Sequence, residues 1–293
     1  MKPNYIEFKK QRDLGEIISD TFAFLRAEFK PFFSTFFKIV GPFLAAMIVA
    51  LVAYLYFIGN GFTFMLQNES GAASIATIFV VGLVYVLSII VLYTMSQSTV
   101  LHYIKSYSNG QGTTDFNTIR KEVYGSFWSF IGLGIMVGLS IIVGIMLCII
   151  PGIYLYVPLA LSFSIMVFDK MGASDSYSYS FKLVKDEWWI SFATIFVIGI
   201  ILYIAALAFS LPAVVYQWAK MGILSGEVDA ENVFEMTTDP LYILFNIIGT
   251  VAQFLLNLIS IISLALIYFN LNEKKNFTGT FEQIENLGKT AEE

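Results

Sequence analysis

Five uncharged polar side chains in the last apolar stretch are the clearest candidates for binding chemistry. They are spaced by four, three, four and three residues, which places them on one face of an α-helix: Asn246, Thr250, Gln253, Asn257 and Ser260. Polar side chains surrounded by hydrocarbon seek hydrogen-bond partners. The row therefore predicts either hydrogen bonds to adjacent helices or a wet cavity or headgroup-binding groove, and both interpretations stay open.

Three short segments with the order apolar, basic, any residue, glutamate, apolar could supply ion pairs. They begin at Leu25, Ile119 and Val184. Inside one segment the basic residue and the glutamate are two positions apart, so they cannot pair on the same helix. Pairs between segments are the candidates, and they would use Arg26, Glu28, Arg120, Glu122, Lys185 and Glu187. We expect charge reversal at Glu122 to be rescued by reversal at Arg26 or Lys185.

Recognisable catalytic and metal-binding motifs are missing from the sequence. His102 is the only histidine and has no Cys or second His at ligand spacing, so the sequence predicts no metal site. No pattern indicates paired acids or an activated nucleophile. We therefore predict no enzymatic activity, no cofactor and no nucleic-acid binding. A lipid-modifying enzyme would require His102 to meet a carboxylate at the cytoplasmic surface.

The elements that must position these residues are membrane helices. Of the 293 residues, 57% are apolar and 13% are charged, against about 25% charged in soluble domains. Five stretches contain no Asp, Glu, Lys or Arg, and the longest is divided at the segment 148–152, where Pro151 cannot continue a helix and Gly152 allows a tight turn. A span needs about 20 apolar residues. The predicted spans are 34–59, 73–101, 127–149, 153–168, 188–215 and 241–270.

The predicted fold class is all-α, a polytopic protein of three hairpins. Apolar residues at helical spacing precede each hairpin and indicate an amphipathic helix in the plane of the membrane. The expected N-caps of these helices are Asp13, Thr114 and Ser174. Residues 1–272 are expected to form a single integral membrane domain, and residues 273–293 a short cytoplasmic tail. Whether the span 153–168 crosses fully stays open, because it is short and contains Pro158.

Orientation follows from the basic residues. In a six-span arrangement, 16 of the 17 Lys and Arg fall on one side, and Lys220 alone falls on the other, within the acidic segment 220–239. Basic loops remain cytoplasmic, so both termini are expected in the cytoplasm. The first 30 residues contain no continuous apolar run, so no cleavable signal peptide is expected.

Two segments resemble a known family. They are LGEIISDT at 14–21, and the stretch from IPGIYL at 150–155 through SFKLVK at 180–185 to Trp188-Trp189. Together they resemble the six-span membrane domain fused to some bacterial glycerophosphoryl diester phosphodiesterases, which YciC-like membrane proteins carry alone. The resemblance implies a bacterial inner membrane location. It does not imply the phosphodiesterase activity, which belongs to a separate soluble barrel.

The favoured functional prediction is a non-catalytic inner membrane protein that organises or binds lipid or a partner membrane protein. Spans without ionisable groups and the in-plane helices favour it. A transporter or permease for an apolar or amphipathic solute is the alternative, motivated by the polar face at residues 246–260. A lipid-modifying enzyme is the second alternative. Expected partners are membrane lipids, with another membrane protein or self-association as a further possibility.

Overall fold

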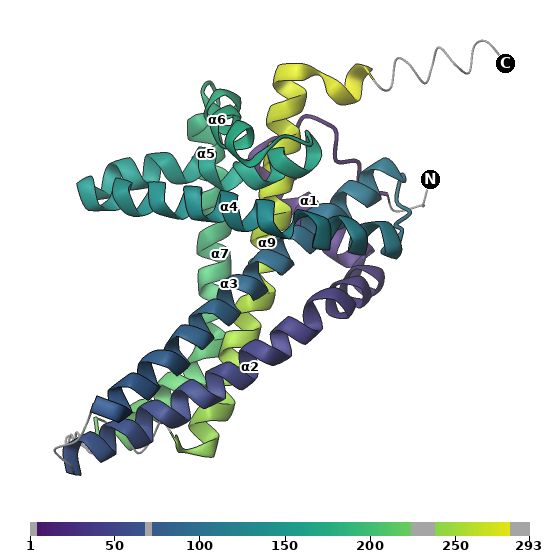
Figure 1. Ribbon diagram of the computed structural model, residues 1–293. Helices are drawn as coiled ribbons and strands as arrows, with labels where there is room; N and C mark the ends of the chain where they lie inside the picture. The colour runs from purple at the N-terminus through teal and green to yellow at the C-terminus, as the bar shows by residue number, and fades with distance from the viewer. Residues whose placement is uncertain (1–4, 68–71, 224–237, 282–293) are drawn as a thin grey trace. The chain divides into compact units, whose positions relative to one another are not determined.

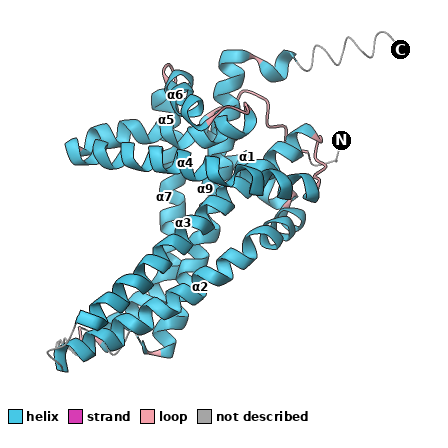
Figure 2. Ribbon diagram, in the orientation of Figure 1, coloured by secondary structure: helices cyan, strands magenta, loops and turns pink. Residues whose placement is uncertain are grey.

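The structure is a computed structural model that describes residues 5–67, 72–223 and 238–281, and the regular elements in these ranges are helices (Figures 1 and 2). The chain is therefore all-α over its described part, as predicted. In chain order the helices are α1 (Leu14–Ala27), α2 (Phe29–Gln67), α3 (Ala72–Asn109), α4 (Phe116–Leu147), α5 (Ile149–Phe168), α6 (Ala173–Val184), α7 (Trp188–Lys220) and α9 (Pro240–Asn276).

Six of the described helices are long and apolar enough to cross a membrane, and they coincide with the six predicted spans. They are α2, α3, α4, α5, α7 and α9. Most extend several residues beyond the predicted spans, because a helix can continue into the headgroup region after its apolar segment ends. The shortest, α5, has 20 residues, which gives a length of about 30 Å, the thickness of the hydrocarbon core. Its length therefore suffices for a full crossing.

The described residues form two compact units, each built from separate stretches of the chain. The described residues of unit 1 fall within 1–39, 94–200 and 258–293, and those of unit 2 within 40–93 and 201–257. The single integral domain over 1–272 stays a prediction. The predicted start of the tail lies inside α9, where Glu273 is buried and accepts hydrogen bonds from the backbone N–H groups of Gly279 and Thr280.

In unit 1, α1 begins with a capping box. The carboxylate of Asp13 accepts from the backbone N–H of Glu16 at 2.7 Å, and the Glu16 side chain accepts from the backbone N–H of Asp13 at 3.1 Å. This arrangement satisfies donors that a helix start leaves unpaired. The helix buries one face through Ile17, Thr21 and Phe24. The N-cap predicted at Asp13 is confirmed. Much of the apolar face of α1 is buried within the protein.

Arg12 connects the segment before α1 to the rest of unit 1. Its side chain is fully buried, and its Nε donates to Asp20 Oδ2 at 2.9 Å. Its other guanidinium nitrogens donate to backbone carbonyls, among them Phe8 O at 2.8 Å, and its backbone N–H donates to Asn270 Oδ1 on α9 at 2.8 Å. A buried guanidinium needs this degree of pairing. Burial lowers the pKa of Arg12 despite the neighbouring carboxylate.

The second and third amphipathic segments differ from the prediction. Asp115, not Thr114, caps α4 by accepting from the backbone N–H groups of Asn117 and Thr118, and the helix then runs without a break into the span. No separate in-plane helix therefore precedes this hairpin. Before the third hairpin a separate helix, α6, does form, but its N-cap is Gly172 and not Ser174. The spacing of apolar residues locates an amphipathic stretch, but it does not show whether that stretch forms a separate helix or continues into the next span.

The hairpin of α4 and α5 turns at one extended residue, Cys148, with φ −173° and ψ 148°. The two helices approach closely beside the turn, where a Cβ on Gly144 would lie 3.0 Å from Gly152 Cα. A side chain at either glycine would displace the opposite backbone. The break predicted within 148–152 is thus confirmed, and it falls at Cys148, while Pro151 and Gly152 lie in the first turn of α5. Gly134 and Gly138, earlier on α4, have no such close neighbour among the described residues, since nothing lies within 4 Å of a Cβ there.

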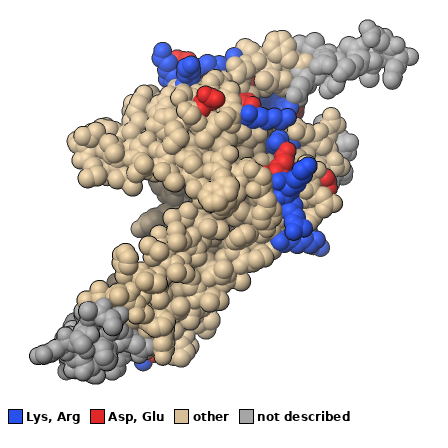
Figure 3. All heavy atoms as spheres, viewed as in Figure 1, with Lys and Arg blue, Asp and Glu red and all other residues tan. Residues whose placement is uncertain are grey.

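Unit 2 is a bundle formed by parts of α2, α3, α7 and α9, which run side by side in Figure 1. Aromatic rings connect the helices: Tyr54 stacks on Tyr85 with centroids 5.3 Å apart, and Tyr93 meets Phe254 edge-on at 5.7 Å. On the face that Figure 3 shows, the described surface of the bundle is almost entirely uncharged. Ring packing is therefore among the contacts that join its helices.

One charged cluster lies at an end of unit 2. Asp239 accepts from the Tyr216 hydroxyl at 2.7 Å and pairs with Lys220 at 3.3 Å. The hydrogen bond from Tyr216 lowers the pKa of Asp239 below its ordinary value, and Lys220 adds to that effect. The rest of the predicted acidic segment, from Glu227 to Glu235, lies outside the described residues.

Candidate functional site

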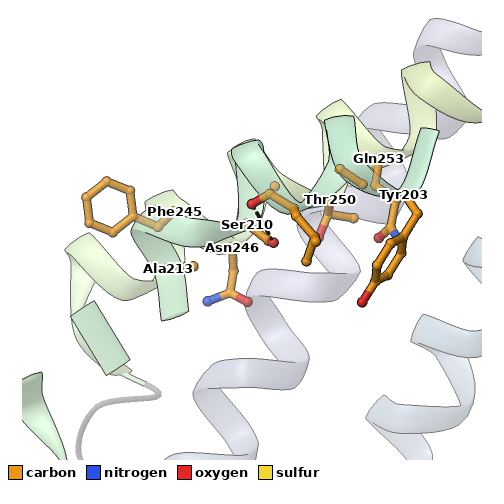
Figure 4. Close-up of a pocket in the computed structure, with 10 residues that line it drawn as sticks. Tyr203, Ser210, Ala213, Phe245, Asn246, Thr250 and Gln253 are labelled. Atoms are coloured by element: carbon orange, nitrogen blue, oxygen red, sulfur yellow. Dashed lines mark hydrogen bonds between the residues drawn. The ribbon is translucent and has the colours of Figure 1, made fainter. Parts of the chain in front are cut away.

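A groove of about 270 Å³ lies in unit 2 between α7 and α9. Figure 4 shows side chains from both helices around it. Its apolar lining includes Leu207, Ala213 and Phe245, while Tyr203, Ser210, Asn246, Thr250 and Gln253 supply polar atoms. No lining residue is charged. The groove is therefore amphipathic, with a polar row set into an apolar wall.

Close approach of the two helices creates the floor of the groove. Gly249 on α9 has no side chain, and a Cβ placed there would lie 3.8 Å from Phe209 O of α7. Ala206 and Ala213 are the small residues that α7 contributes to the lining. Small residues at a helix interface allow backbones to come close. Here they also leave an indentation that larger side chains would fill.

Hydrogen bonding in the groove is partly local. The Asn246 amide donates to Tyr242 O, one turn earlier, at 2.9 Å, and Ser210 Oγ donates to Leu207 O at 3.1 Å. Asn246 keeps its side-chain oxygen and a second N–H for other partners. Gln253, at the same face, is exposed. The row can thus offer both donors and acceptors to a ligand, while it offers no nucleophile paired with a base.

The predicted polar face divides into two parts. Asn246, Thr250 and Gln253 line the groove, whereas Asn257 and Ser260 are half-buried and do not line it. Sequence reasoning missed the α7 side of the groove. Tyr203 and Ser210 are seven residues apart, so they share a helix face, and this spacing was the signal that could have indicated a second polar row.

His102 in unit 1 lies near a carboxylate, which the lipid-modifying enzyme hypothesis required. Its Nε2 is 3.9 Å from Glu122 Oε2, too long for a hydrogen bond. Its Nδ1 lies 2.8 Å from Ser98 O and 3.2 Å from Ser98 Oγ, and Ser98 Oγ lies 3.0 Å from Ser126 Oγ. Ser98 is fully buried, and the lipid-modifying enzyme hypothesis stays a prediction.

The three glutamates of the repeated segments make contacts with other residues than those predicted. Glu122 pairs with Lys105 at 2.9 Å, and Glu187 pairs with Lys274 at 3.1 Å. Glu28 is buried and accepts from the Tyr103 hydroxyl at 2.8 Å. Pairing of these glutamates with Arg26, Arg120 or Lys185 stays a prediction. These contacts join each segment to the part of α3 or α9 that belongs to unit 1.

Metal coordination has no candidate among the described residues. No group of three or more His, Cys, Asp or Glu in this part of the chain could hold a metal ion. The single cysteine, Cys148, is exposed at the α4–α5 turn. The groove between α7 and α9 offers apolar contact and uncharged hydrogen-bonding groups.

Comparisons with protein families, with curated proteins and with solved structures find no match to this chain. The resemblance to the six-span bacterial membrane domain therefore stays a prediction. The class that the fold defines is nevertheless clear: the chain is an all-α, multi-pass membrane protein, and six of its described helices are long and apolar enough to span the bilayer.

Proposed function

We propose that this protein is a non-catalytic membrane module that binds lipid, and that the groove between α7 and α9 holds part of a lipid molecule. One observation carries the proposal: an uncharged groove within two apolar helices presents both an apolar wall and a polar row. An acyl chain matches the wall, and ester or hydroxyl groups match the row. Binding of a charged solute would instead call for an ionisable partner in the groove.

The location and orientation expected from the basic residues belong to the same proposal. A bacterial inner membrane with both termini in the cytoplasm would place the 16 basic residues outside 220–239 on the cytoplasmic face. Lysine and arginine on that face favour anionic lipid headgroups. This arrangement suits a protein that gathers lipid or a partner membrane protein around its spans.

Native mass spectrometry of the full chain, released from gently solubilised membranes, tests lipid binding. A matched pair of substitutions on α7 localises it. Ala206→Leu adds bulk in the groove, whereas Ala205→Leu adds the same bulk one position away from its lining. We expect retained lipid to fall for Ala206→Leu and to stay unchanged for Ala205→Leu. A wild-type protein that retains neither lipid nor partner would refute the proposal.

Transport of an amphipathic solute is the second candidate function. The observation that favours it is the polar row of Asn246, Thr250 and Gln253, which follows α9 for about two turns along the groove. Reconstitution into vesicles and measurement of lipid or solute flux would test it. Flux that is lost when all three residues are replaced by apolar isosteres would support transport, and unchanged flux would exclude it.

A further inference from the structure

A second cavity lies in unit 1, and its lining contains charged residues, unlike that of the groove in unit 2. It has a volume of about 290 Å³ and forms where the end of α3, the turn after α5 and the late part of α9 meet the segment before α1. Charged and polar groups dominate its lining, among them Lys9, Lys105, Asp169, Lys170, Asn272 and Thr278. Its size is near the lower end of the range of about 300–1,000 Å³ for small-molecule sites.

Three lysines give this pocket a positive character. Lys105 is held by Glu122 at 2.9 Å and its side chain is 15% exposed, so its ammonium is positioned in advance. Lys170 has φ 55°, the left-handed region that a residue with a side chain rarely adopts. That conformation sets the direction of the chain directly after the pocket residue Asp169. Ammonium groups collected around a cavity are a common arrangement for binding phosphate.

Asp169 supplies the opposite charge at the same pocket. Its Oδ1 accepts from the Tyr268 hydroxyl at 2.6 Å, while its Oδ2 is buried and has no hydrogen-bond partner within the described residues. A buried acceptor without a partner is costly. Burial raises the pKa of Asp169, although the Tyr268 hydrogen bond opposes that shift. A donor on a ligand would satisfy the unpartnered oxygen.

We propose that this pocket binds a phosphate ester that carries a primary amine, the chemistry of a phosphoethanolamine group. The phosphate would lie among Lys9, Lys105 and Lys170, and the ammonium would donate to Asp169 Oδ2. The same group can come from a lipid headgroup or from a free phosphate ester. The pocket lies in unit 1, so binding here does not depend on the groove of unit 2.

The first experiment measures binding of small probes to the full chain in detergent by isothermal titration calorimetry. The probes are free phosphoethanolamine, phosphocholine and inorganic phosphate. Phosphocholine carries the same charges, but its quaternary ammonium cannot donate a hydrogen bond to Asp169. If the source is a free ester, phosphoethanolamine binds more tightly than the other two probes. Lys170→Ala then lowers the affinity for phosphoethanolamine about tenfold, the effect of losing one charged hydrogen bond. Asp169→Asn removes the preference over phosphocholine.

The second experiment addresses the lipid source, with the full chain in nanodiscs that contain equal phosphatidylethanolamine and phosphatidylcholine. Native mass spectrometry then counts the retained lipids. If the source is a lipid, phosphatidylethanolamine is enriched, and Asp169→Asn abolishes the enrichment. Lys121→Ala, an exposed lysine of unit 1 outside the pocket, serves as the control and should change neither measurement. The proposal is overturned if neither free phosphoethanolamine nor phosphatidylethanolamine is preferred over its choline counterpart. It is also overturned if Asp169→Asn leaves that preference intact.

Discussion

The two units of this protein are stabilised by different kinds of contact. Unit 1 buries Arg12, Glu28 and Glu273 and gives each a set of hydrogen-bond partners. Unit 2 has no charged residue in its described bundle except Lys220 and Asp239 at one end. A buried charge tolerates few arrangements, because its partners must lie at fixed positions. Apolar packing tolerates many more arrangements of the side chains.

This difference matches the functions proposed for the two units. A groove with uncharged walls can accept acyl chains of varied length, since dispersion and area burial do not depend on direction. The pocket of unit 1, with three lysines and Asp169, can discriminate between headgroups. We infer that substitutions in unit 1 will mainly affect stability and headgroup selectivity, and that substitutions in unit 2 will mainly affect how much lipid is retained.

The largest expected effect is the loss of Arg12. Arg12→Ala removes the buried guanidinium that donates to Asp20 and to the carbonyl of Phe8, and leaves Asp20 only its pair with Lys10 at 3.3 Å. The free energy of unfolding should therefore fall by about 3 kcal/mol. Denaturant titration of the full chain in mild detergent measures the change. Arg120→Ala is the control, because Arg120 is exposed, and its effect should stay below about 0.5 kcal/mol. Equal losses of unfolding free energy for the two substitutions would refute the claim that buried charged residues stabilise unit 1.

A smaller loss is expected where α4 and α5 approach each other. Gly144→Ala places a Cβ 3.0 Å from Gly152 Cα, so the helices must separate. The expected cost is about 1–2 kcal/mol of unfolding free energy. Gly138→Ala, on the same helix, has no atom within 4 Å of its new Cβ and should be neutral or slightly stabilising. The same titration would contradict the close approach if both variants behaved alike.

Next in size is the hydrogen bond between α1 and α9 in unit 1. Thr21 Oγ1 lies 3.2 Å from Ser263 Oγ and donates to Ile17 O, and both side chains are buried. Thr21→Val keeps the shape and removes the hydroxyl, which should cost about 1 kcal/mol. Thr21→Ser, which retains the hydroxyl, should preserve the hydrogen bond in a crystal or electron microscopy structure. A fully stable Thr21→Val variant would show that this bond contributes nothing.

The smallest effect on stability is expected in the groove of unit 2. Gln253 is exposed, so Gln253→Leu should change the unfolding free energy by less than about 0.5 kcal/mol. It should nevertheless alter which lipids copurify, because it removes a donor and an acceptor from the polar row. Gln217→Leu, on α7 and outside the groove lining, is the matched control. A large loss of stability for Gln253→Leu would mean that the row supports the fold.

Local features of the sequence determined the helices. Charge-free stretches located the six spans, the segment 148–152 located the break between α4 and α5, and Asp13 marked the start of α1. Each of these signals acts over a few residues or over one helix length. Hydropathy and capping depend on such neighbours, so they can be predicted without knowing what lies across the fold.

Tertiary structure alone decided which side chains meet. Asn246, Thr250 and Gln253 were predicted as a row, but only the fold brought α7 beside them to form a groove. Glu122 and Glu187 were predicted to form ion pairs, and in the structure they pair with Lys105 and Lys274, which the sequence did not indicate as partners. The partners come from distant segments, because the two units are each assembled from separate stretches. Helix spacing fixes the face a side chain occupies, while its partner depends on how the helices pack.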